Sequence, residues 1–162
     1  MFVSTVGGGQ HDVSITTEWR PVRRGLRRSD RLLAHGEEPP LGAHLVTPRR
    51  GFAHHGIYVG GDRVVHYGSF PLYWRRGAVE EVSFTSFANG YAVWVRPHPV
   101  PRFAAEEVRD RARSRLGETS YRLFTNNCEH FCEWCVCGEP RSYQVEGLLR
   151  LNLNLNLQGG DQ

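Results

Sequence analysis

The spacing of apolar and polar positions changes once along the chain, near residue 101, and this change predicts the order of the fold. Between residues 43 and 95 the apolar positions form short runs bounded by glycine, asparagine and charged residues, as is typical of β-strands. These runs predict five strands, at 43–46, 56–59, 63–67, 81–84 and 91–95. Gly60-Gly61-Asp62 has the composition of a hairpin loop, and Asn89-Gly90 predicts a turn between the last two strands.

After three prolines between residues 97 and 101, the apolar spacing becomes helical. Alanine, valine and leucine positions four residues apart share one stripe and predict a helix over 104–116, which Gly117 ends. Cysteine and phenylalanine positions at i, i+3, i+4 and i+7 predict a second helix over 127–136 that turns this face to the core. Strands followed by helices predict an α+β fold with an antiparallel sheet packed against helices.

The two ends of the chain differ in pattern from the middle. Residues 1–38 are rich in glycine and arginine and show little periodicity, which predicts a flexible extension. Residues 148–162 are a low-complexity tail, in which leucine and asparagine alternate over 151–157 with the period of an added edge strand. A single domain over 39–147 is expected between them.

Composition narrows the choice of compartment and partner. The 162 residues are 40% hydrophobic and 23% charged, as in a soluble globular domain. No apolar run approaches the roughly 18 residues that cross a bilayer, and the first residues lack a secretory-signal pattern, so we expect a cytoplasmic protein with its cysteines as thiols. The net charge of +3 is too small to indicate nucleic acid as a partner. The arginines between residues 20 and 31 are compatible with a solvated arm or with peripheral contact to anionic lipid.

The most specific chemical pattern is Asn126-Asn127-Cys128-Glu129. Asn126 is a good N-cap residue, and Glu129 stands three positions later, where a capping-box acid reaches back to the cap amide. This numbering puts Cys128 at the second helical position, where free amides and the helix dipole favour a thiolate. The alternative is a buried cysteine that acts as a small apolar residue.

A cysteine nucleophile needs a base, usually histidine. His54 and His66 lie on the two strands of the predicted hairpin and share a face if the loop has an odd number of residues. A two-residue loop puts them on opposite faces unless a bulge intervenes. His55 competes for the role of base, but strand alternation puts only one of the two neighbours on the face of His66, and this parity favours His54. Each histidine is also compatible with an ordinary hydrogen-bonded role at a sheet edge.

The cysteines allow two other interpretations. Five side chains that can bind metal lie within ten residues: Cys128, Cys132, Cys135, Cys137 and His130. All of them fall on one helix and its end, and no second pair of ligands follows, which disfavours a zinc module. The C-x-x-C spacing of Cys132 and Cys135 lies inside a helix and not at its start, which disfavours a redox motif. No glycine-rich nucleotide motif is present, so no cofactor is expected.

Three motifs in this order resemble a known family. They are His54-His55-Gly56-Ile57-Tyr58-Val59-Gly60, Val64-Val65-His66-Tyr67 and Asn127-Cys128-Glu129-His130-Phe131. The chain is similar in these segments, and over about residues 41–145, to the lecithin:retinol acyltransferase (LRAT) domain. That resemblance implies a circularly permuted papain-like fold of the NlpC type, in which the histidines precede the cysteine.

The resemblance also implies a thiol acyltransfer mechanism. Cys128 would attack an ester carbonyl of a phospholipid and become an acyl thioester, with His54 as general base and His66 orienting His54. We expect backbone amides at the helix start to stabilise the oxyanion. Water as acceptor would make the protein a hydrolase, and an amine or alcohol would make it an acyltransferase. A cysteine amidase or peptidase and a catalytically silent binding domain remain alternatives, because a fold does not name its substrate.

Overall fold

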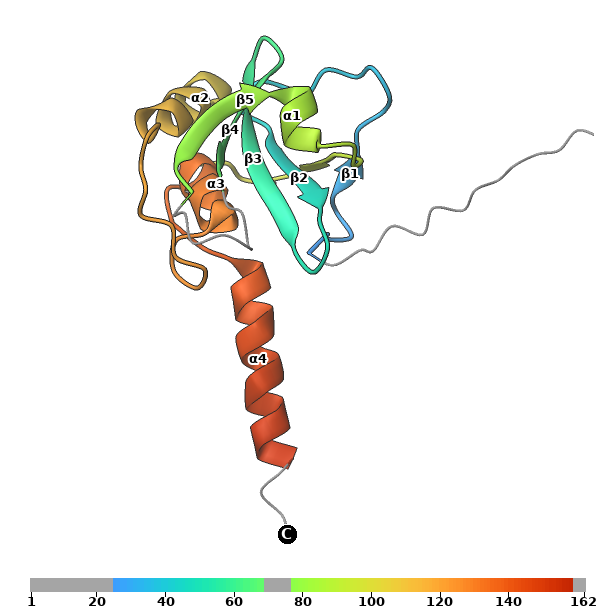
Figure 1. Cartoon of the computed structure of the whole chain (residues 1–162), viewed down its shortest axis with the longest axis vertical. Helices are drawn as coiled ribbons and strands as arrows, with labels where there is room; N and C mark the ends of the chain where they lie inside the picture. The colour runs from blue at the N-terminus through green and yellow to red at the C-terminus, as the bar shows by residue number, and fades with distance from the viewer. Residues whose placement is uncertain (1–24, 69–76, 159–162) are drawn as a thin grey trace, which may run out of the picture.

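The structure is a computed structural model that describes residues 25–68 and 77–158 (Figure 1). In chain order its elements are β1 (Arg31–Leu32), β2 (His44–Pro48), β3 (Ala53–Gly60), β4 (Arg63–Tyr67), β5 (Val79–Ser83), α1 (Phe84–Ala88), β6 (Trp94–Arg96), α2 (Ala105–Ser114), α3 (Cys128–Cys137) and α4 (Tyr143–Gln158). The strands pair antiparallel in one sheet of order β1-β6-β2-β3-β4-β5. The predicted α+β fold is thereby confirmed.

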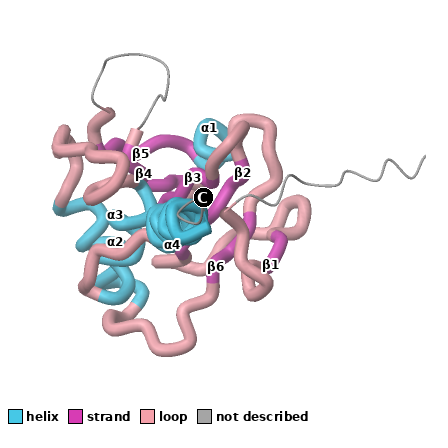
Figure 2. Tube along the Cα trace, turned by 90° about the horizontal axis from the view of Figure 1, so that it is seen from below, coloured by secondary structure: helices cyan, strands magenta, loops and turns pink. Residues whose placement is uncertain are grey.

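Helices cover both faces of the sheet. α2 and α3 pack against β3 and β4 on one face, and α1 lies over the other (Figure 2). Ile57 and Val65 join Phe131 of α3 in one buried cluster, whereas Tyr58 joins Phe87 of α1 in a second. Successive side chains of β3 therefore serve two different cores, as the alternation of a strand requires.

The predicted strands are all present, with shifted ends. Those at 43–46, 56–59 and 63–67 are β2, β3 and β4, and those at 81–84 and 91–95 are β5 and the shorter β6. β5 ends at Ser83 because the Ser83 side chain accepts a hydrogen bond from the Ser86 N–H at 3.1 Å and caps α1. The apolar pattern did not predict this short helix, which ends at Asn89 in a left-handed conformation (φ 49°).

Residues 25–38 of the predicted extension belong to the described structure. β1 pairs with β6 at the sheet edge. Asp30 forms an ion pair with Arg96 at 3.0 Å, and Arg27 forms one with Glu133 of α3 at 3.2 Å. This part of the chain is therefore tied to the core, while residues 1–24 lie outside the described residues.

The two predicted helices at 104–116 and 127–136 are present as α2 and α3. The alternating segment 151–157 lies in α4 and not in an edge strand. α4 points away from the sheet (Figure 1), and three of its leucines, Leu148, Leu149 and Leu151, are exposed. Within residues 25–68 and 77–158, no helix has both the length and the apolar character needed to cross a membrane.

Candidate active site

Cys128 is the first residue of α3. Asn127 is its N-cap, since Asn127 Oδ1 accepts hydrogen bonds from the N–H groups of Glu129 (3.0 Å) and His130 (3.1 Å). His130 completes the capping box, because its Nδ1 accepts from the Asn127 N–H. The predicted cap, with Asn126 and Glu129, is wrong by one residue, and Cys128 lies one position nearer the helix start than expected.

Glu129 is not part of the cap and anchors α3 to the interior instead. Its Oε1 pairs with Arg96 Nη1 at 2.7 Å, and its Oε2 accepts from Ser142 Oγ (2.7 Å) and the Gln144 N–H (3.0 Å). The carboxylate is 1% exposed, and these partners compensate its burial. The start of α3 is thereby fixed against β6 and the start of α4.

The Cys128 sulfur is buried where α3 meets β3. Burial raises the pKa of the thiol to about 12, although backbone hydrogen bonds from His55, Glu129 and Cys128 itself act in the opposite direction. The expected thiolate is therefore wrong for this conformation, because the cost of desolvating the charge exceeds the stabilisation at the helix start. Cys128 is a neutral thiol with backbone amides already directed at its sulfur.

His54 and His66 share a face of the sheet through a bulge. β3 and β4 are joined by a two-residue loop, which by itself would put them on opposite faces. A register shift before Gly60 corrects this parity, so that His66 pairs with Gly56. His54, two residues before Gly56, then points to the same side, and its Nε2 lies 2.9 Å from His66 Nδ1.

Gly56 leaves the space in which the two imidazoles meet an aromatic ring. A Cβ at this position would lie 2.7 Å from Val64 Cγ1 and 2.8 Å from Phe87 Cε2. The Phe87 ring packs against both imidazoles, with centroids 5.4 Å from His54 and 5.8 Å from His66. α1 therefore holds the histidine pair from the side opposite α3.

Glu80 of β5 lies beside the second ring nitrogen of His66. Glu80 is the cross-strand partner of His66, and its Oε1 lies 3.4 Å from His66 Nε2. A nearby carboxylate favours a proton on His66 Nε2, and in that tautomer His66 Nδ1 accepts from His54 Nε2–H. His54 Nδ1 is left unprotonated, and among the described residues this buried atom has no hydrogen-bond partner. A free lone pair on a buried imidazole is what a general base requires.

Both imidazoles are neutral at neutral pH. Burial, and then the neighbouring His66, holds the pKa of His54 well below its usual 6.5. Burial also lowers the pKa of His66 to about 4.

The described residues show no hydrogen bond between the histidine pair and Cys128. The imidazoles contact Phe87 on the α1 face, whereas the Cys128 side chain lies in the cluster beneath α3. The sulfur nevertheless meets the backbone of His55, the residue after His54, next to the last β3–β4 pair. The sulfur and the imidazoles therefore approach neighbouring residues of β3, the sulfur from the α3 side and the imidazoles from the α1 side.

His55, the competing base, lies on the α3 side of the sheet and is fully buried. Its Nδ1 lies 2.8 Å from His44 Nε2, and its Nε2 lies 2.9 Å from Gln144 Nε2. Both of its nitrogens are engaged, whereas His54 has a free one. Its backbone, and not its imidazole, contacts the sulfur of Cys128.

The other cysteines have different surroundings. Cys132 and Cys135 are buried in the apolar cluster, and burial raises the pKa of each, so they behave as core residues. Cys137 is half-buried, with its Sγ 3.5 Å from His98 Nδ1. Among the described residues all four cysteines are free thiols.

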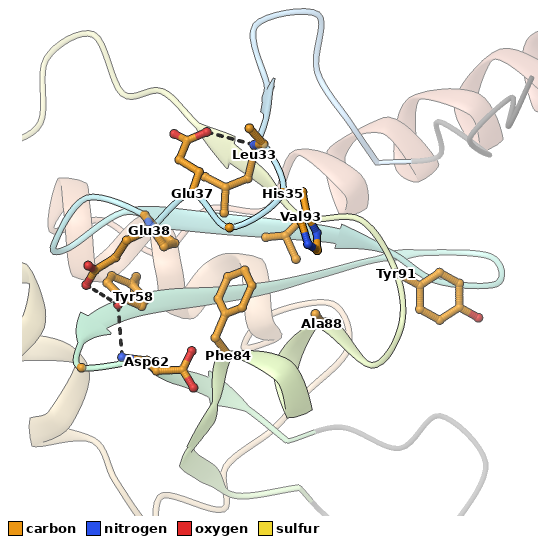
Figure 3. A pocket seen from close by; sticks show the side chains of 14 residues that line it. Leu33, His35, Glu37, Glu38, Tyr58, Asp62, Phe84, Ala88, Tyr91 and Val93 are labelled. Carbon is orange, nitrogen blue, oxygen red and sulfur yellow. Dashed lines mark hydrogen bonds between the residues drawn. The ribbon is translucent and has the colours of Figure 1, made fainter. Parts of the chain in front are cut away.

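A pocket of about 670 Å³ opens on the α1 face, at the end of β3 farthest from His54 (Figure 3). Tyr58, Phe84 and Val93 give it an apolar lining, and the Tyr58 hydroxyl donates to Glu38 at 2.7 Å. α1 thus lines the pocket with Phe84 and turns Phe87 to the histidines. Neither His54 nor His66 lines this pocket, and neither does Phe87, which packs against both imidazoles.

An antiparallel sheet that carries paired histidines, followed by a helix that begins with cysteine, is the arrangement that the sequence motifs predicted. A family model described as lecithin retinol acyltransferase matches residues 37–141. The chain belongs to this family.

Curated relatives agree with the family match. The chain is 31% identical to lecithin retinol acyltransferase of Bos taurus and 32% to that of Homo sapiens, each over 129 residues that cover 63% of this chain and 56% of the relative. It is also 31% identical to phospholipase A and acyltransferase 2 of Homo sapiens, over 67% of this chain and 77% of that protein. The chain therefore spans about half the length of the lecithin retinol acyltransferases that it matches.

Sequence reasoning missed the residues that hold the histidine pair: Gly56, Glu80 and Phe87. Glu80 was accessible in principle, because the register of β4 against β5 places it opposite His66. Phe87 was not, since it reaches the pair through α1, which the apolar pattern did not reveal.

Proposed function

We propose that this protein is a cysteine-dependent acyltransferase or phospholipid acyl hydrolase that works through an acyl-Cys128 intermediate. The observation that supports this most is the free Nδ1 of His54, whose other ring nitrogen contacts His66 and whose chain neighbour His55 meets the Cys128 sulfur through its backbone. The names of the relatives, lecithin retinol acyltransferase and phospholipase A and acyltransferase, support an ester of a phospholipid as acyl donor.

In the first half-reaction the Cys128 thiol proton passes to His54 Nδ1 as the sulfur bonds to the ester carbonyl carbon. The C–O bond of the donor then breaks, and the leaving alkoxide takes the proton from His54. In the second half-reaction an O–H or N–H acceptor gives its proton to His54 as it attacks the thioester carbonyl carbon, and the C–S bond breaks. The displaced sulfur then takes the proton back from His54, which restores the thiol and the neutral imidazole. His66 steadies the imidazolium, and the Cys128 amide, which the Asn127 cap leaves unused, is our candidate oxyanion donor.

The neutral state of both partners shapes this mechanism. A thiol with a pKa of about 12 beside a neutral imidazole forms no resting ion pair. Proton transfer would therefore accompany attack on the substrate, when developing negative charge is shared with the carbonyl oxygen. The reaction also requires the Cys128 sulfur and His54 Nδ1 to come together, since the described residues show no hydrogen bond between them. The resulting site, with histidines before cysteine in the chain, corresponds to the permuted papain-like arrangement.

The decisive experiment is incubation with phosphatidylcholine, followed by intact-mass measurement of the protein. We expect one acyl adduct on Cys128 that is labile to hydroxylamine, absent in Cys128→Ala and greatly reduced in His54→Ala. Cys132→Ala, which removes another buried cysteine of α3, is the matched control and should still be acylated. An adduct that persists in Cys128→Ala would contradict the proposal.

Two other functions predict different results in the acylation experiment. An amidase or peptidase would form the Cys128 adduct with a peptide-derived acyl probe and not with lipid. A silent binding domain would form neither, and its Cys128 would react with thiol reagents no faster than in His54→Ala. The presence of Cys128, His54 and His66 together favours catalysis over a silent domain.

We also propose that the protein acts in the cytoplasm, with the arginine-rich segment in peripheral contact with anionic lipid. Arg20, Arg23 and Arg24 precede β1 in the sequence and lie outside the described residues. Replacing these three by glutamine should weaken flotation with phosphatidylserine vesicles and leave thermal stability unchanged. Equal flotation of variant and wild type would exclude this role.

A further inference from the structure

Four side chains with metal-binding atoms converge between the sheet and α3, away from the histidine pair. His44 begins β2, His98 follows β6, and Glu133 and Cys137 lie one turn apart on α3. Ligand atoms of His44, His98 and Glu133 all lie within 4.8 Å of one another. Cys137 Sγ lies 3.5 Å from His98 Nδ1, and its thiol is hydrogen-bonded to Glu133.

The distances from His98 to the side chains of α3 are close to those of a tetrahedral site. A zinc ion bound to N, O and S donors at about 2.0–2.3 Å keeps those donors about 3.3–3.6 Å apart. Here His98 Nδ1 lies 3.5 Å from Cys137 Sγ and 3.8 Å from Glu133 Oε2. His98 faces His44 with its Nε2, at 2.9 Å from His44 Nδ1, and faces α3 with its Nδ1, so one ion can bind all four side chains once an imidazole turns and this hydrogen bond breaks.

The charges and the surrounding contacts also fit. One carboxylate and one thiolate supply two negative charges to a divalent cation, of which Glu133 shares its own with Arg27, and the two imidazoles bind in their neutral form. The other nitrogen of His44 is hydrogen-bonded to His55, the kind of outer contact that orients a metal-bound imidazole. His98 and Cys137 are only half-buried, which gives an ion access from solvent.

We propose that His44, His98, Glu133 and Cys137 form a structural Zn²⁺ site that clamps β2, the segment after β6 and α3 together. This site is separate from the cysteine cluster considered from the sequence, since Cys137 is the one cysteine that it uses. It is also independent of the proposed acyl chemistry, because none of its ligands takes part in that mechanism.

The ring nitrogens of the same residues can also find hydrogen-bond partners without an ion. A hydrogen-bonded relay is therefore the alternative to a metal site. Gln144 Oε1 accepts from the Ala53 N–H, so Gln144 Nε2 is the donor to His55 Nε2. His55 Nδ1–H can then donate to His44, His44 Nδ1–H to His98, and His98 Nδ1–H to the side chains of α3. A relay of neutral imidazoles would need no metal, and it would be insensitive to chelators.

Cobalt titration of the tag-free full chain, after treatment with a chelator, separates the two. We expect one Co²⁺ per chain, visible d–d bands of a tetrahedral site and a thiolate-to-metal charge-transfer band, with Zn²⁺ displacing Co²⁺. His98→Ala should lose binding, and Cys137→Ser should lose the charge-transfer band. His54→Ala and Cys128→Ser are the matched controls and should keep both.

Thermal unfolding gives a second readout that does not depend on colour. Zn²⁺ should raise the melting temperature of the wild type and of Cys128→Ser, but not that of His98→Ala, because only a site of the folded state stabilises by mass action. Absence of Co²⁺ binding, or binding that His98→Ala and Cys137→Ser leave unchanged, would overturn the site and favour the relay.

Discussion

We predict that Glu80 influences which nitrogen of His54 carries a proton. Its carboxylate lies 3.4 Å from His66 Nε2 and favours a proton there, and in that tautomer His54 donates through Nε2 and keeps Nδ1 free to act as base. Glu80→Gln can present an amide N–H in place of the carboxylate, so the tautomer is no longer fixed. We expect acylation of Cys128 to slow by roughly tenfold, which corresponds to about 1.4 kcal/mol.

Glu81→Gln is the control for this measurement. Glu81 is the next residue of β5 but pairs with Arg63 and Arg113, away from His66. It should leave the acylation rate unchanged. If Glu80→Gln and Glu81→Gln behave alike, Glu80 does not position the histidine pair.

The buried environment of His54 predicts an acid-tolerant reaction. Protonated His54 cannot accept the thiol proton, so the rate falls as the pH falls through its pKa. Because burial holds that pKa well below 6.5, kcat/KM for acylation should stay level from pH 8 to below 6.5 before it declines. A pH profile whose acid limb has its midpoint above 6.5 would show that His54 is not the base in this environment.

At the level of elements, the bulge in β3 explains why the sequence could not decide whether His54 and His66 share a face of the sheet. The sequence between the two strands is compatible with a hairpin loop of two or of three residues, and the two lengths put His54 on different faces of the sheet. Which face His54 takes depends on one extra residue of β3 before Gly60, which shifts the register of β3 against β4. The strands, α2 and α3 were predictable because their apolar spacing is strong, whereas α1 depends on a single side-chain cap at Ser83.

Gly56 links this register to the site. Gly56→Ala places a methyl group against Val64 and the Phe87 ring, and we expect a loss of about 1–3 kcal/mol of unfolding free energy. Gly147→Ala, in α4, meets no atom within 4 Å and should be neutral or stabilising by up to about 1 kcal/mol. Urea unfolding of the two variants measures the difference. Equal stabilities would mean that Phe87 can move away from the pair.

At the scale of the whole molecule, the thiol shows where sequence reasoning stops. The helix start predicted a thiolate, and the local cause is present, since amides face the sulfur. The sign of the pKa shift is nevertheless set by burial, and burial depends on how α3 packs on β3. The sequence pattern predicted that Cys128 lies at the start of a helix. The electrostatic environment of its thiol depends on the packing of the whole fold and could not be predicted from that pattern.

The same burial predicts that acid unfolds the protein. Burial is the largest cause of the lowered pKa of His54, His66 and His130. The unfolded chain binds these protons near pH 6.5 and the folded chain does not, so each histidine removes up to about 1.4 kcal/mol of stability per pH unit as the pH falls below 6.5. This loss continues until the folded pKa, about 4 for His66, is reached. Since domains have a free energy of unfolding of only about 5–15 kcal/mol, three such groups bring unfolding within reach near pH 5.

Urea unfolding at pH 7.5 and 5.5, with a chelator present, should show that the free energy of unfolding falls by several kcal/mol. The fall should be smaller in the double variant His54→Gln/His66→Gln. A stability that is equal at the two pH values would mean that these imidazoles protonate freely in the folded state, and so that they are not held neutral by the sheet and α1.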